Sequence, residues 1–139
     1  MATPIHSTDL DAAVFDHIDP RSPNPIYAQI AARVRIAVAA GDLCTGDPLP
    51  SVRALAAQLR VNPATVVQAY RELEREGVVD MRQGSGTFIA TVPSERRART
   101  RDAEARRLVR EMLEKAARLA IHPADLRRAI AVELGERDS

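Results

Sequence analysis

The chain has 139 residues, of which 45% are hydrophobic, enough for one folded domain with an appendage. No apolar run approaches membrane-spanning length, and no charged-then-apolar stretch typical of a secretory signal opens the sequence. The single cysteine, Cys44, excludes an internal disulfide and fits a reducing compartment, so we expect a cytoplasmic protein with no membrane partner. The net charge of +1 is too small to argue for nucleic-acid binding, so that argument depends on where the arginines lie.

Residues 1–21 predict a flexible acidic arm, because they hold four aspartates against one arginine and show no hydrophobic periodicity. The arm is expected to be mobile or loosely docked, with a short strand at 13–18 as the candidate regular element. His6 and His17 stand apart from each other and from any cluster of ligands, so we expect no metal site.

A helix is predicted from Pro25 to about Ala40, since proline suits the first position of a helix and Gly41 can end it. One apolar face recurs along it at helical spacing, formed by Ile26, Ile30, Val34 and Ala37 or Val38. We interpret Arg33 and Arg35 as part of its solvated face. A connecting turn follows at 43–50.

A helix-turn-helix is predicted at about 51–77. Ser51 can cap the first helix, which is expected to begin at Ser51 and to end at Arg60 and Val61. Asn62 and Pro63 then supply an N-cap and a first helical position for the second helix, which Gly77 ends. Its core face is expected to consist of Val66, Ala69, Tyr70 and Leu73. The second helix of such a motif can enter a DNA major groove.

A β-hairpin is predicted at 78–90. Two β-prone stretches, 78–82 and 87–89, flank the sequence Gln83-Gly84-Ser85-Gly86, whose glycines tolerate positive φ. A Gly-x-Gly sequence alone is equally compatible with an ordinary turn. Directly after a helix-turn-helix, the hairpin is better interpreted as a wing, whose small tip lets the backbone approach a phosphate or a minor groove.

The segment Leu49–Ala90 (LPSVRALAAQLRVNPATVVQAYRELEREGVVDMRQGSGTFIA) resembles the winged-helix domain of the GntR family of bacterial transcriptional regulators. Its VNPATVVQAYRELE stretch and the preceding PNPIYAQI, at Pro23–Ile30, resemble the YtrA branch most closely. The resemblance extends over residues 18–90. It implies a winged helix-turn-helix DNA-binding domain at 22–91, with a short strand in the 43–50 segment that pairs with the wing.

The resemblance and the predicted helix faces together give a set of DNA-binding candidates. Arg53 corresponds to an arginine that grips phosphate in similar family members, and many members carry arginine where this chain has Pro63 and Val67, so guanine recognition by those two positions is lost. Asparagine and glutamine can pair with adenine, and threonine can contact a phosphate or a thymine methyl group. The full set is Ser51, Arg53, Asn62, Ala64, Thr65, Gln68, Arg82, Gln83, Gly84 and Gly86.

Two further groups of arginines are ambiguous. Arg71 and Arg75 alternate with Glu72, Glu74 and Glu76, which favours a solvated, salt-bridged face over DNA contacts. A basic cluster after the wing either touches flanking phosphates or is an ordinary helix surface. Its members are Arg96, Arg97, Arg99 and Arg101.

Residues 94–135 predict a two-helix dimerisation tail. One long helix is expected from Ser94 to Leu119 and a second from Pro123 to about Leu134. Their apolar stripe is too wide for a small winged helix to bury, so we expect a homodimer, with folding back onto the chain's own domain as the alternative. The YtrA resemblance also implies a two-helix dimerisation tail. The dimerisation candidates are Leu108, Val109, Met112, Ala116, Leu119, Leu126 and Ile130.

The predicted fold is mainly α with a small β-hairpin, a winged helix-turn-helix domain followed by the two-helix dimerisation tail. The predicted function is a sequence-specific transcriptional repressor that binds a near-palindromic double-stranded DNA operator as a homodimer. One alternative is an enzyme, because MocR-type proteins fuse a similar winged helix to an aminotransferase-like domain. The roughly 49-residue tail cannot house such a domain, and Lys115 is the only lysine that could form a Schiff base, so we expect no enzyme and no cofactor.

A second alternative is a winged helix that makes only protein contacts. It would leave the polar, groove-facing set around Asn62, Thr65 and Gln68 without a purpose, and a gel shift would separate the two. The sequence leaves a small-molecule effector open, since a pocket at the dimer interface and the absence of any pocket are both compatible with it.

Overall fold

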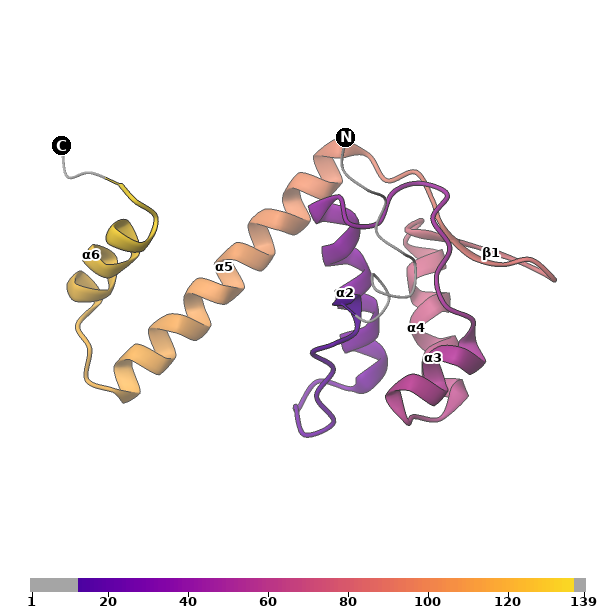
Figure 1. Cartoon of the computed structure of the whole chain (residues 1–139), viewed down its shortest axis with the longest axis horizontal. Coiled ribbons are helices and arrows are strands. Elements are labelled where there is room, and N and C mark those ends of the chain that lie inside the picture. Colours follow the sequence, from indigo (N-terminus) through magenta and orange to yellow (C-terminus); the bar gives the residue numbers. More distant parts are fainter. Residues whose placement is uncertain (1–12, 137–139) are drawn as a thin grey trace. The chain divides into compact units, whose positions relative to one another are not determined.

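The computed structural model describes residues 13–136 (Figure 1). The chain forms two compact units, of which the first ends at Arg101 and the second begins at Asp102. The elements are α2 (Ile26–Ala40), α3 (Val52–Leu59), α4 (Pro63–Arg75), β1 (Val79–Arg82), β2 (Gly86–Ile89), α5 (Ser94–Arg118) and α6 (Pro123–Glu133). The mainly helical fold with one antiparallel hairpin confirms the predicted class. Among the described residues, no helix is long and apolar enough to cross a membrane.

Helix α2 ends as predicted, but it begins at Ile26, one residue later than the sequence predicts. Pro25 is its extended N-cap, and Gly41 takes the left-handed conformation at φ +85°, where its N–H faces the carbonyls of Ala37 and Val38. The predicted apolar face is buried at Ile30, Val34, Ala37 and Val38, and Ile26 is partly buried against the core.

Local caps position the helix-turn-helix. The Ser51 hydroxyl accepts a hydrogen bond from the Ala54 N–H at 3.0 Å, and Asn62 Oδ1 accepts one from the Ala64 N–H at 2.9 Å. Helix α3 therefore begins at Val52, one residue later than predicted, because Ser51 is extended to act as the cap. Arg60 ends α3 in the left-handed conformation, at φ +57°.

Helix α4 is the centre of the first unit and packs against both α2 and α3 (Figure 1). Its predicted core residues Val66, Ala69, Tyr70 and Leu73 are all fully buried. The Tyr70 hydroxyl donates a hydrogen bond to the Pro50 carbonyl at 2.7 Å. Since Pro50 immediately precedes the cap of α3, this bond ties the second helix of the motif to the start of the first.

The hairpin pairs Val79 with Ile89 and Arg82 with Gly86. The segment 43–50, which connects α2 to α3, lies along the free edge of β2. There the Leu49 N–H donates to the Thr87 carbonyl and the Ile89 N–H donates to the Asp47 carbonyl, both at 2.8 Å. This pairing confirms the third-strand contact that the family resemblance implied, although only Pro48 and Phe88 form a bridge there.

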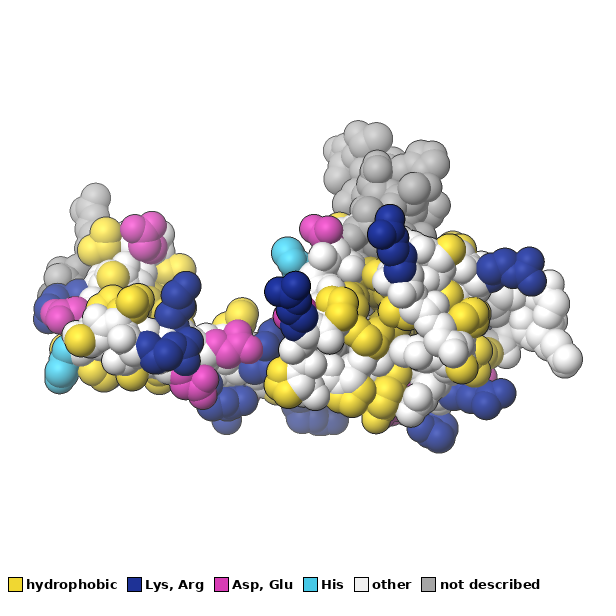
Figure 2. Space-filling model, turned by 90° about the horizontal axis from the view of Figure 1, so that it is seen from below, with side chains coloured by type: hydrophobic (Ala, Val, Ile, Leu, Met, Phe, Trp, Pro, Cys, Tyr) yellow, Lys and Arg dark blue, Asp and Glu magenta, His cyan; other side chains and the backbone are white. Residues whose placement is uncertain are grey.

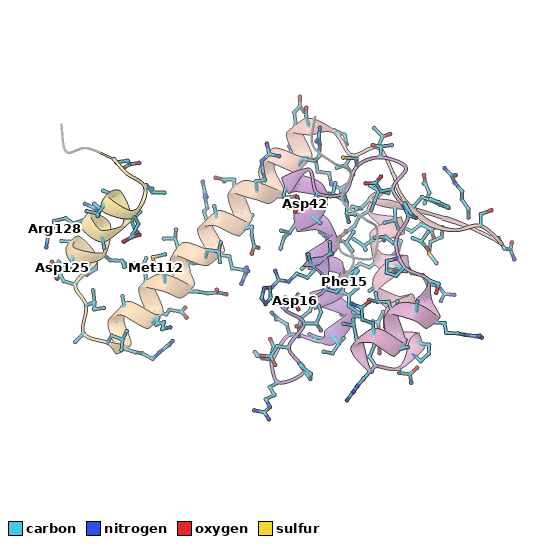
Figure 3. All side chains as sticks on the ribbon, in the orientation of Figure 1. Phe15, Asp16, Asp42, Met112, Asp125 and Arg128 are labelled. Carbon is cyan, nitrogen blue, oxygen red and sulfur yellow. The ribbon has the colours of Figure 1, made fainter. Side chains whose placement is uncertain are left out.

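The strand predicted at 13–18 is wrong. Residues 13 and 14 are helical, and residues 15–17 form a turn. Val14 and Phe15 are buried in the core, with 9% and 2% of their surface exposed, and Figure 3 shows Phe15 pointing in among the helices of the first unit. Burial of these two side chains docks the segment from residue 13 onward to the domain. Residues 1–12 of the predicted arm lie outside the described residues.

In the tail, α5 and α6 have the predicted extents to within a residue. Ala120, at φ +59°, follows the last turn of α5, and His122 Nδ1 accepts a hydrogen bond from the Ala124 N–H at 3.1 Å as the cap of α6. On α5, Arg107 donates a side-chain hydrogen bond to the Glu104 carboxylate, and this bond, together with Glu111, raises the pKa of Arg107 above its usual value. The sequence predicted that α6 begins at Pro123, but it predicted neither the His122 cap nor the left-handed conformation of Ala120.

Candidate nucleic-acid interface

The outward face of α4 is defined by the residues that it buries. At 100° per residue, positions 64, 68, 71 and 75 fall on one stripe opposite the buried Val66 and Leu73. All four side chains on this stripe are exposed, whereas Thr65 is half-buried at its edge. The structure thus brings Ala64 and Gln68 together as predicted and places Arg71 and Arg75 beside them.

The predicted DNA-binding candidates at the starts of α3 and α4 are exposed, and two of them also cap a helix. Ser51 and Asn62 each use a side-chain oxygen as a helix cap, which leaves the amide NH₂ of Asn62 as a donor. Arg53 is exposed in the first turn of α3. Cap formation fixes the Ser51 side chain at the start of α3 and the Asn62 side chain at the start of α4.

A groove runs between α4 and the wing, with a volume of about 730 Å³. Its lining includes five of the predicted DNA-binding candidates and five residues outside that set, among them Arg71 and Glu74. The lining residues are Ser51, Val52, Arg71, Glu74, Met81, Arg82, Gln83, Gly84, Gly86 and Thr87. Arg53 and the α4 candidates Ala64, Thr65 and Gln68 lie outside this groove.

The wing presents Arg82 in a fixed place. Its guanidinium carbon lies 4.7 Å from the centre of the Phe88 ring, a cation–π contact across the hairpin. At the tip, Gly84 and Gly86 adopt φ values of +81° and +117°, which only glycine adopts freely. The tip therefore offers backbone and one anchored cation.

The interpretation of Arg35 as a solvated residue is wrong. Its Nε and Nη2 each donate to a carboxylate oxygen of Glu76 at 2.8 Å, and Glu72 lies 3.8 Å away. These two glutamates of the α4 C-terminal region are therefore paired with α2. Arg71 and Arg75 are exposed, as predicted. Between described residues, no carboxylate lies within 4.0 Å of their guanidinium nitrogens, so the salt bridges predicted for these two arginines are wrong.

Two arginines of the basic cluster after the wing hold helix ends. Arg96 Nη1 donates to the carbonyl of Glu76 at the end of α4, and Arg101 Nη1 donates to the carbonyl of Ala39 near the end of α2, at 2.6 Å in the second case. The last carbonyls of a helix lack partners within it and carry partial negative charge, so arginine satisfies both needs. Arg96 and Arg101 thus have a structural role that neither alternative from the sequence included.

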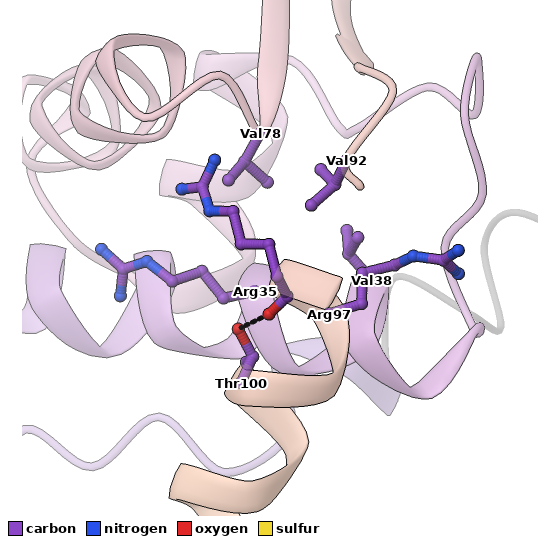
Figure 4. Close-up of a pocket in the computed structure, with 7 residues that line it drawn as sticks. Arg35, Val38, Val78, Val92, Arg97 and Thr100 are labelled. Carbon is purple, nitrogen blue, oxygen red and sulfur yellow. Dashed lines mark hydrogen bonds between the residues drawn. The ribbon is translucent and has the colours of Figure 1, made fainter. Parts of the chain in front are cut away.

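The small pocket beside this cluster does not gather its cations around one ligand. It is lined by residues of α2, the region around the hairpin and α5, including Arg35, Arg97 and Thr100. Figure 4 shows the guanidinium groups of Arg35 and Arg97 pointing to opposite sides. On the face of the molecule in Figure 2, basic side chains are likewise scattered rather than collected in one large patch. Across the described residues, no cluster of three or more potential metal ligands is found.

Comparison with known proteins identifies the family. Residues 26–89 match the family described as bacterial regulatory proteins, gntR family. The HTH-type transcriptional repressor YtrA of Bacillus subtilis is 49% identical over 73 residues, which cover 52% of this chain and 56% of YtrA. The chain therefore matches little more than half the length of that relative.

Two further similarities extend over more of the chain. YhcF of B. subtilis, named as an uncharacterized HTH-type transcriptional regulator, is 44% identical over 94 residues, or 68% of this chain and 74% of YhcF. The solved structure of a GntR family transcriptional regulator from Listeria monocytogenes matches with a TM-score of 0.60 at 29% identity, over 81% of this chain and 96% of that one. These relatives are named as regulators of transcription and not as enzymes. The chain belongs to the GntR family of bacterial regulatory proteins, among its YtrA-like members.

Proposed function

We propose that this protein is a transcriptional repressor that binds a near-palindromic operator as a homodimer. The observation that carries the proposal is the exposed stripe of α4. It presents the polar side chain of Gln68, which could contact bases, and it continues through Arg71 into the groove beside the wing. A helix with such a face fits the major groove, where base edges differ in their donor and acceptor patterns. Since the proposed partner is DNA, we expect the protein to act in the bacterial cytoplasm.

Base recognition is assigned to the first two turns of α4. Gln68 is exposed and can pair with adenine, while Asn62 keeps its amide donors and Thr65 lies at the edge of the same face. Ala64 adds an apolar contact of the kind that suits a thymine methyl group. Arg53 and the wing residues are assigned to the phosphate backbone, which positions the protein without reading sequence.

Dimerisation is assigned to the tail, because its apolar side chains are exposed. Exposed fractions are 52% for Leu108, 47% for Val109, 40% for Met112 and 62% for Leu119, whereas Ala116 is buried. Within the second unit, a groove of about 520 Å³ runs between α5 and α6, lined by Val109, Met112, Leu113, Leu126 and Ile130 among others. Apolar surface of this extent favours association with a second copy. A small-molecule effector, if one binds, is expected at this interface.

Selection of DNA fragments by the purified protein tests the DNA-binding proposal. We expect the selected fragments to share two inverted half-sites about one helical turn apart, roughly 34–36 Å, because a two-fold dimer presents two α4 helices. A gel shift then measures affinity for the selected site and for random DNA. Equal affinity for both would overturn the sequence-specific function, and an asymmetric single site would overturn the two-fold dimer.

Light scattering tests the interface. Replacing Val109 and Met112 together by Asp should give monomers, because both side chains line the tail groove and a charge there must be desolvated on association. Val132→Asp is the matched control, since Val132 is 73% exposed and does not line the groove. A double variant that stays dimeric with unchanged helix content would place the interface elsewhere.

A further inference from the structure

We propose that the groove between α4 and the wing holds one phosphodiester strand of the DNA, and that Arg71 is a phosphate ligand there, opposite Arg82. This inference rests on the proposed DNA-binding function. It adds a contact residue outside the set predicted from the sequence, and it assigns the groove to backbone and not to base edges.

The position of the groove determines what it can meet. On one side lies the exposed stripe of α4, which is assigned to the major groove, and on the other lies the glycine-rich wing. In duplex DNA a major groove and the adjacent minor groove are separated by a single sugar–phosphate strand. A protein that places a helix in one and a wing at the other therefore has that strand between them.

Arg71 is available for this strand because its acidic neighbours are engaged elsewhere. Glu72 and Glu76 face Arg35 of α2, with two hydrogen bonds of 2.8 Å to Glu76. Glu74, which also lines the groove, accepts a hydrogen bond from the Met81 N–H at 3.3 Å and so faces the wing backbone. Arg71 itself is exposed and lines the groove.

Arg82 supplies the second cation from the opposite wall. Its contact with the Phe88 ring, at 4.7 Å, holds the guanidinium on the wing and limits the side-chain entropy lost on binding. Beside it, Gly84 has no atom within 4 Å of the place where a Cβ would stand, so the tip leaves room for a backbone to approach. Two arginines against the one carboxylate of Glu74 give the groove the charge that a polyanion requires.

The test compares Arg71→Ala with Arg75→Ala in the full-length protein. Arg75 is the matched control because it is an exposed arginine on the same stripe of α4 that does not line the groove. Affinity is measured for the selected operator and for random duplex DNA at salt concentrations from 50 to 200 mM. Circular dichroism checks that each variant keeps the helix content of the wild type.

Each phosphate contact contributes about −0.9 to the slope of the logarithm of affinity against the logarithm of salt concentration. A dimer that lacks two contacts should therefore show a slope that is shallower by roughly 1.8. Over a fourfold rise in salt, the wild type should then lose about tenfold more affinity than Arg71→Ala. The variant should bind operator and random DNA more weakly by a similar factor, while Arg75→Ala should keep the wild-type slope.

Two results would overturn the assignment. A loss confined to the operator would make Arg71 a base-reading residue, and an unchanged salt slope would show that it does not touch the backbone. Failure of the wild type to bind any duplex would refute the proposed function itself, so the two failures are distinguishable.

Discussion

Tyr70 offers a direct test of how the helix-turn-helix is held together. Its side chain is fully buried, and its hydroxyl donates to the Pro50 carbonyl at 2.7 Å, across 20 positions of sequence. Replacing Tyr70 by Phe removes the donor and leaves the ring, so no large cavity forms. The carbonyl of Pro50 then loses its partner in a partly buried place.

The expected cost is about 1–2 kcal/mol, between the net value of an ordinary hydrogen bond and the penalty for a fully buried unpaired carbonyl. For a domain of about 100 residues, this corresponds to a Tm lower by roughly 5–10 °C. Because the proposed dimer would make Tm depend on concentration, wild type and variant must be compared at equal protein concentration. Thermal unfolding followed by circular dichroism gives the shift, and urea titration gives the free energy of unfolding.

Tyr27→Phe is the matched control, since the chain contains two tyrosines and Tyr27 is half-buried on α2. Within the described part of the chain, its hydroxyl makes no hydrogen bond that a Phe would lose. We expect this change to stay within about 0.5 kcal/mol of the wild type. If Tyr70→Phe unfolds together with Tyr27→Phe, the bond to Pro50 contributes nothing to stability, and the stated link between α4 and α3 is wrong.

Two further predictions concern DNA recognition. Gln68→Ala should relax preference at one symmetric pair of operator positions and cost roughly 1–3 kcal/mol on the operator, with binding to random DNA barely changed, as measured by competition gel shifts; an equal loss on both DNAs would make Gln68 a backbone or folding residue. Arg53→Ala should weaken binding to all sequences alike and flatten the salt slope by about one unit per lost contact, and an unchanged slope would show that Arg53 does not reach a phosphate.

Elements governed by local chemistry could be predicted from the sequence. Ser51 and Asn62 cap their helices through atoms two or three residues away, and Gly41 ends α2 through its own backbone conformation. Such signals involve residues only a few positions apart. The sequence therefore predicted the helix-turn-helix and the hairpin at the positions where the structure has them. The start of α3 differed by one residue because a cap and a first helical residue have similar sequence preferences.

Contacts between distant residues could not be predicted in this way. Arg35 and Glu76 are 41 positions apart, and Arg101 reaches Ala39 across 62. The residues next to Phe15 do not indicate that its side chain is buried in the core of the first unit. The β-branched neighbours Val14 and Ile18 give the segment a β-prone composition instead. The sequence disfavoured the phosphate contact that we propose for Arg71 for the same reason, because Glu72 and Glu76 pair with Arg35 only once α2 packs beside α4.

Glu76 makes two separate contacts, and these limit which residues of the chain can change independently of one another. Its carboxylate holds Arg35 and its carbonyl holds Arg96, so one residue joins α2, α4 and α5. Because these three residues share contacts, the effects of substitutions at Arg35, Glu76 and Arg96 on stability are expected to be coupled. Ala64, Gln68 and Arg71 stand outside this network on the exposed stripe. Under the proposed assignment of base recognition to Ala64 and Gln68, a lineage can therefore change its operator through these two side chains without first repairing the fold.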